Sequence, residues 1–179
     1  MKDLMKRKTK IALVLCLPVL GMAIEARADE ARAGCQHVRG GVTSTVIPSP
    51  NDPFGRALNN VDGVLNGAST ALITGFGQAP APFIVLTATS FEVFVTNGGD
   101  MLTATGAATL TPVPGKPPGE FTENTTLTVT GGTGKYAGAT GTITLEGQGH
   151  NVFGGPGVAT FNLIYQGSVC GPNIKGDKD

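Results

Sequence analysis

The stretch NTTLTVTGGTGKYAGATGTITLEGQG, residues 124–149, decides the fold of this chain. Its first part alternates threonines with the apolar residues Leu127 and Val129, and its last part alternates in the same way around Ile143 and Leu145. Alternation with a period of two is typical of a β-strand that buries one face. The stretch therefore predicts two strands that follow each other closely along the chain.

A glycine-rich turn connects these two strands. It contains Gly131, Gly132 and Gly134, and glycine can adopt the positive φ angles that tight connections need. We therefore predict that the three glycines form a structural turn, and that the chain folds back on itself as a neighbouring antiparallel strand.

The same glycines match the spacing of a dinucleotide-binding loop, G-x-G-x-x-A, at residues 132–137. That loop works only when a helix follows it and an acidic residue stands about 20 positions further on. Residues 138–145 favour a strand, and no acidic residue lies near position 154. A phosphate-binding P-loop is excluded as well, because Tyr136 follows Lys135 where Ser or Thr is required. No cofactor is expected.

The rest of the chain carries short alternating segments bounded by Gly, Pro or Asn, and no sustained helical spacing. The expected strands are Val38–Ile47, Ala57–Leu65, Ser69–Phe76, Phe83–Val95, Met101–Leu110, Glu120–Thr130, Ala139–Gly149 and Val158–Val169. Eight strands suffice to close a small barrel. We predict an all-β fold, a single antiparallel eight-stranded β-barrel over residues 35–172, with a flexible tail at 173–179.

Prolines mark two of the expected connections. The segment Pro48–Pro53 is predicted to separate the first two strands, and Pro112–Gly119 is predicted to form a long rigid loop after the fifth.

The N-terminal segment has the order of a secretory signal peptide. Lysines and Arg7 precede an apolar run at residues 11–24, and Ala26-Arg27-Ala28 is a small-x-small cleavage site, with a second at Ala31–Ala33. The alternative is a membrane anchor, but the apolar run is shorter than the ~20 residues that a span usually needs. We predict a removed signal peptide at residues 1–28 and a secreted or periplasmic protein.

The charge of the remaining chain limits the classes of molecule that we expect it to bind. Residues 29–179 hold seven Lys and Arg against 11 Asp and Glu, a net charge of −4, and the chain has no Trp. Without a basic patch, nucleic acid is not an expected partner. No second hydrophobic span follows, so no stable membrane span is predicted.

Two cysteines remain after removal of the signal peptide, one at each end of the domain. Cys35 precedes the first expected strand and Cys170 follows the last. In a barrel with an even number of strands these two positions meet at one rim, and cysteines in an oxidising compartment usually pair. We predict a Cys35–Cys170 disulfide; the alternative is two free thiols.

The segment Thr130–Gly141 resembles the GGTG-x-[FY]-x-x-A-x-G signature shared by dirigent proteins and allene oxide cyclases. Residues Val61–Gly67, Gly99–Gly106 and Thr111–Pro114 also fit that barrel superfamily, and the sequence most resembles its exported bacterial members of uncharacterised role. The resemblance implies an eight-stranded antiparallel barrel with an apolar cavity. Characterised relatives hold an oxidised fatty acid or a pair of phenoxy radicals there and often form oligomers, so it also allows for a homo-oligomer. None of the chain's acidic residues is carried over as catalytic.

Glu92 is the candidate for a catalytic residue. It shares a strand face with Phe94, opposite Phe91, Val93 and Val95. If it faced the barrel interior, Glu92 would be a desolvated carboxyl group with a raised pKa, suited to general acid–base chemistry. An outward orientation is favoured, because glutamate is rarely buried.

Three aromatic residues are candidates for ligand binding: Phe94, Phe161 and Tyr165. The alternative for Phe161 and Tyr165 is ordinary core packing. His37 and His150 lie far apart in the sequence, and no Cys, His and Asp cluster has zinc spacing, so no metal site is expected.

These observations favour an exported barrel that binds a small apolar or aromatic molecule. One alternative is a cyclase, isomerase or dirigent-like coupling protein, and another is a structural or adhesive envelope protein. The size and lining of the barrel interior, with the direction in which Glu92 points, are the most useful observation for separating these functions.

Overall fold

A computed structural model describes residues 34–49, 51–78, 85–152 and 158–175. The predicted signal peptide at residues 1–28 and the last four residues of the predicted tail lie outside the described residues.

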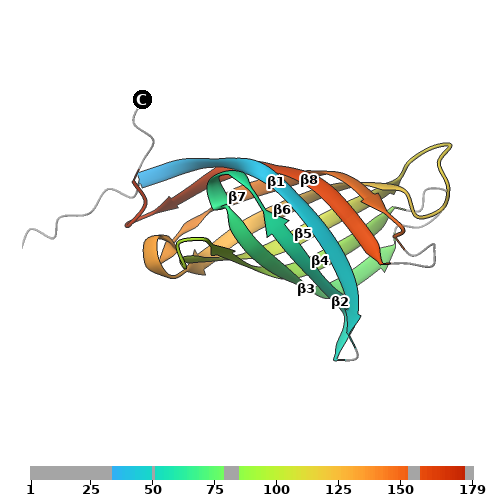
Figure 1. Ribbon diagram of the computed structural model, residues 1–179, viewed down its shortest axis with the longest axis horizontal. Coiled ribbons are helices and arrows are strands. Elements are labelled where there is room, and N and C mark those ends of the chain that lie inside the picture. The colour runs from blue at the N-terminus through green and yellow to red at the C-terminus, as the bar shows by residue number, and fades with distance from the viewer. Residues whose placement is uncertain (1–33, 50, 79–84, 153–157, 176–179) are drawn as a thin grey trace, which may run out of the picture. The chain divides into compact units, whose positions relative to one another are not determined.

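The described chain forms one closed antiparallel barrel of eight strands (Figure 1), as the sequence predicted. The strands are β1 Gly34–Ser49, β2 Asp52–Val61, β3 Gly67–Gln78, β4 Leu86–Thr96, β5 Met101–Pro112, β6 Phe121–Gly132, β7 Thr140–His150 and β8 Ala159–Gly171. Each strand pairs with the next, and β8 pairs with β1 to close the sheet. Closure leaves no edge strand for other chains to extend.

Alternation along the strands separates interior from surface. In β6, Thr125, Leu127 and Val129 are buried, whereas the intervening Thr126 and Thr128 are exposed. The threonines suit this outer face, because β-branched residues pack well on a pleated surface.

Two connections differ from the expectation. Strands β1 and β2 extend into the proline segment from its two sides, and Ser49 already pairs with Asp52. Pro48 is tolerated because the register shifts between Ile47 and Ser49, and a bulge needs no donor at that point. The second expected strand also ends early: Gly63–Leu65 forms a 3-10 turn, η1.

The glycine-rich turn joins β6 to β7 as a second 3-10 turn, η2, at Gly134–Tyr136. Gly134 has a φ of +58°, and a Cβ atom there would collide with Oδ1 of Asp100. The side chain of Asp100 accepts a hydrogen bond from the backbone N–H of Lys135 at 3.3 Å. β7 follows, so this stretch continues as a strand and not as a nucleotide-binding helix.

The cysteine pair lies at the closing seam of the barrel. Cys35 on β1 stands directly opposite Cys170 on β8, with an S–S distance of 2.14 Å. The predicted pairing is confirmed, and such a bond is typical of an oxidising compartment.

The two ends of the barrel differ in packing. We call the end that holds this disulfide, η1 and η2 the disulfide end, and the end with the β1–β2 turn the hairpin end. Leu65 of η1 and Tyr136 of η2 are almost fully buried, together with Leu102 and Val169. The disulfide end is therefore filled with side chains. No helix in the described ranges is both long and apolar enough to cross a membrane.

Candidate ligand cavity

A cavity of about 460 Å³ occupies the barrel interior toward the hairpin end. Its lining includes Val42, Ser44, Val46, Ala57, Asn59, Ala71, Ile73, Phe76, Ala88, Ser90, Glu92, Ala108, Leu110, Glu123, Thr125, Leu145, Val152, Phe161 and Leu163. Most of these side chains are apolar, which is usual for a small-molecule site.

Small side chains leave this space open. Strands β2 to β5 each place an alanine in the lining: Ala57, Ala71, Ala88 and Ala108. Larger residues, Leu145, Phe161 and Leu163, face them from β7 and β8. Ala159 of β8 also lines the cavity, so small residues on five strands leave this space open.

Glu92 lies inside the barrel, so the outward orientation that the sequence favoured is wrong. Its side chain is only 6% exposed and lines the cavity. The Ser90 hydroxyl donates a hydrogen bond to its Oε1 at 3.2 Å. The pKa of Glu92 is raised from 4.5 to about 7, mainly by burial; the Ser90 hydrogen bond opposes this rise, and repulsion from Glu123 adds to it.

Gly106 on the neighbouring strand makes room for this pair. It stands opposite Ser90, and a Cβ atom at Gly106 would collide with the Ser90 Oγ and lie 3.4 Å from Oε1 of Glu92. Because Gly106 has no side chain, the Ser90 hydroxyl and the Glu92 carboxyl group both fit against the inner face of β5.

A second carboxyl group, Glu123 on β6, also lines the cavity and was not a candidate from the sequence. The Thr125 hydroxyl donates to its Oε1 at 2.6 Å. Burial raises the pKa of Glu123, and the Thr125 hydrogen bond opposes this rise. The signal was present in the sequence, because Glu123 shares its strand face with Leu127 and Val129.

The two carboxyl groups lie close enough for Glu123 to raise the pKa of Glu92. Glu92 bonds to Ser90, which lies two residues closer to the hairpin end, whereas Glu123 bonds to Thr125, two residues closer to the disulfide end. Between them runs β5, where Gly106 pairs with Ser90 and Ala108 pairs with Thr125. Glu92 itself pairs with Ala104 and Glu123 with Leu110, so Gly106 and Ala108 are the inward-facing β5 residues between these two positions.

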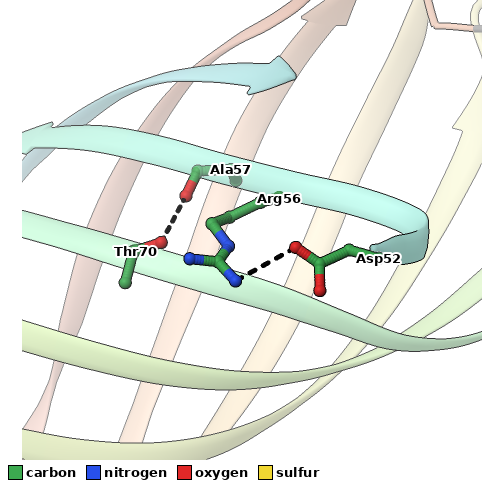
Figure 2. A network of polar contacts seen from close by, with 4 residues as sticks. All are labelled: Asp52, Arg56, Ala57 and Thr70. Carbon is green, nitrogen blue, oxygen red and sulfur yellow. Dashed lines mark hydrogen bonds and ion pairs between the residues drawn. The ribbon is translucent and has the colours of Figure 1, made fainter. Parts of the chain in front are cut away.

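Charged residues at the hairpin end form an ion pair at the rim (Figure 2). Arg56 Nη2 lies 3.0 Å from Oδ2 of Asp52, and Asp52 lines the cavity. The Arg56 side chain is about half exposed. Beside it, the Thr70 hydroxyl donates to the Ala57 carbonyl at 3.1 Å, which ties β3 to β2.

Asn59 contributes a further polar group to the lining. Its Nδ2 donates to Ser69 Oγ at 2.8 Å, while its Oδ1 is buried without a hydrogen-bond partner among the described residues. A buried acceptor of this kind is uncommon and is usually satisfied by a bound molecule or water.

The three aromatic candidates have different positions. Phe161 lines the cavity. Phe94 is buried in the core and is not part of the lining. Tyr165 is also outside the lining; its hydroxyl accepts from Leu65 N–H at 2.8 Å and donates to the Asp62 carbonyl at 2.7 Å.

The two histidines occupy separate strands. His37 pairs with Ser168 in the β1–β8 register, and His150 Nδ1 lies 2.6 Å from Oε2 of Glu120. Within the described ranges, no group of three or more His, Cys, Asp or Glu residues is arranged to hold a metal ion.

Comparison with known proteins gives no relative. No family model, curated protein or solved structure matches this chain. The site must therefore be interpreted from its own geometry.

Proposed function

We propose that this protein is exported to a secreted or periplasmic location and binds a small apolar or aromatic molecule inside its barrel. The observation that carries the proposal is the 460 Å³ cavity, lined mainly by apolar side chains and supplied with a few polar groups. Ligand sites commonly have volumes of roughly 300–1,000 Å³ and this mixture of lining residues.

The disulfide and the N-terminal sequence support export. Cys35 and Cys170 are bonded, and residues 1–28 have the features of a removable signal peptide. Mass measurement of protein recovered from the periplasm or medium tests this part, with a mature chain beginning at Asp29 or Gly34 expected. A chain that keeps its first 28 residues would contradict it.

A second function, catalysis of the cyclase or isomerase kind suggested by the dirigent and allene oxide cyclase resemblance, draws support from Glu92. A carboxyl group with a pKa of about 7 is suited to general acid–base work near neutral pH. A structural or adhesive role has less support. That hypothesis predicts an interior filled with side chains, whereas this barrel contains a cavity.

A substitution that fills the cavity with a larger side chain tests whether the cavity binds a ligand. Ala108 lines the cavity, whereas its neighbour Ala107 is exposed on the outer face of the same strand. Binding of 1-naphthylmethanol and related apolar aromatic probes is measured by fluorescence and thermal shift. We expect Ala108→Leu to abolish binding and Ala107→Leu to leave it unchanged. Absence of binding by every probe to the wild-type protein would overturn the proposal.

A further inference from the structure

We propose that the cavity takes a ligand with a protonated amine on an apolar or aromatic body, and that the amine lies between Glu92 and Glu123. This inference rests on the proposed binding function and specifies the chemical class of its ligand.

The first argument is an incomplete hydrogen-bonding arrangement around a buried carboxyl group. The Ser90 hydroxyl reaches only Oε1 of Glu92, and Oε2 has no hydrogen-bond partner among the described residues. Since the side chain is only 6% exposed and lines the cavity, this oxygen can be satisfied only from the cavity. Glu92 Oε2 is not among the fully buried atoms that lack a partner, so it is open to the cavity and can accept a hydrogen bond from a molecule held there.

The second argument is charge. None of the described lining residues is Lys, Arg or His, although two carboxyl groups are close enough for one to raise the pKa of the other. The cation at the rim, Arg56, is already paired with Asp52. Buried carboxylates are costly unless they are paired. A ligand ammonium group would supply both the missing positive charge and the N–H donors.

The geometry favours a cation over the other head groups. The two glutamates stand on opposite sides of β5, where they pair with Ala104 and Leu110, and between these two positions β5 presents only Gly106 and Ala108 to the interior. An anionic head group at this place would add a third negative charge. A neutral alcohol would donate one hydrogen bond and leave the charge unbalanced. The apolar body would then lie against Ala88, Ala108 and Phe161.

Three probes with one aromatic body separate these head groups: 1-naphthylmethylamine, 1-naphthylmethanol and 1-naphthoate. Their emission can be followed without interference from tryptophan, because the chain contains none. At pH 8 we expect the amine to bind at least about tenfold more tightly than the alcohol, and the naphthoate to bind most weakly. This comparison needs no variant.

Substitutions of the two glutamates then test where the amine of the ligand binds. Glu92→Gln and Glu123→Gln are each expected to weaken amine binding by about tenfold and to leave alcohol binding within about threefold. Glu146→Gln is the matched control, because Glu146 is exposed on the outer face of β7 and should have no effect. Far-UV circular dichroism verifies that each variant is folded.

Proton release gives an independent readout. A cation stabilises the ionised carboxyl groups, so amine binding near pH 7 should release protons, measured by calorimetry in two buffers of different ionisation enthalpy. Affinity for the amine should rise from pH 6 to pH 8, while affinity for the alcohol should not.

The outcomes separate this inference from the proposed function. Tight alcohol binding with equal or weaker amine binding would overturn the amine inference and leave the binding function standing. Amine binding that survives both glutamine substitutions would also overturn it. If none of the three probes binds, the binding function itself fails.

Discussion

The hydroxyl group of Tyr165 accepts a hydrogen bond from the backbone N–H of Leu65 at 2.8 Å, although the two residues are 100 positions apart. The same hydroxyl donates to the Asp62 carbonyl at 2.7 Å. One phenol on β8 therefore holds the segment around η1, and this segment places the fully buried Leu65 in the disulfide end.

Removal of this hydroxyl should destabilise the barrel without affecting the cavity. Tyr165→Phe leaves a buried N–H group unpaired, so we expect the free energy of unfolding to fall by about 1–3 kcal/mol. Urea unfolding followed by circular dichroism measures the change. Tyr136→Phe is the matched control, because the Tyr136 hydroxyl is buried without a partner among the described residues, and its loss should cost little. Equal losses in the two variants would contradict this account.

The disulfide should stabilise the closing seam. Replacement of Cys35 and Cys170 by serine opens a loop with a sequence separation of 135 residues. We expect a loss of about 2–4 kcal/mol, because the unfolded chain gains conformational freedom. The measurement is urea unfolding of the double variant, compared with wild-type protein with and without reductant. Coincident curves for the oxidised and reduced wild-type protein would show that the bond contributes nothing.

The sequence was sufficient for the fold because its strong signals are local. The alternation around Leu127 and Ile143 assigns one face of each strand to the interior, and the glycine-rich turn requires them to be neighbours. The proline segment misled the prediction because Pro48 fits a bulge inside a strand as well as a loop.

The site was harder to predict because it depends on several strands together. On β4, large apolar residues stand on both faces: Phe91 is 41% exposed, while Phe94 is buried beside Glu92. Local alternation cannot tell which face is inside when both are apolar. The cavity likewise depends on alanines from five strands, and no single segment reveals that combined space.

The buried carboxyl group should make stability depend on pH. The pKa of Glu92 is about 7 in the folded protein, against an ordinary value of 4.5. Between these two pH values the folded state binds more protons than the unfolded state, so stability should fall as pH rises from about 4.5 to about 7. The loss should approach about 3 kcal/mol at most. Below and above this window Glu92 contributes no further change.

Glu92→Gln is the variant that tests this dependence. It should flatten the decline measured by urea unfolding at several pH values, and it should be more stable than the wild-type protein at pH 8. A smaller slope should remain, because the pKa of Glu123 is also raised. A wild-type protein whose stability rises over this pH range would contradict the buried carboxyl group as the cause.

Ser90 should influence the pH at which Glu92 titrates. Its hydroxyl bonds to Oε1 of Glu92 and favours the ionised form, so Ser90→Ala should move the pKa of Glu92 above about 7. Carbon-13 NMR of the glutamate side chains, titrated from pH 5 to pH 9, measures the midpoint directly. Thr89→Ala is the control, because that hydroxyl lies on the exposed face and contacts Thr74. A midpoint that moves to lower pH in Ser90→Ala, or moves equally in both variants, would show that the serine does not stabilise the carboxylate.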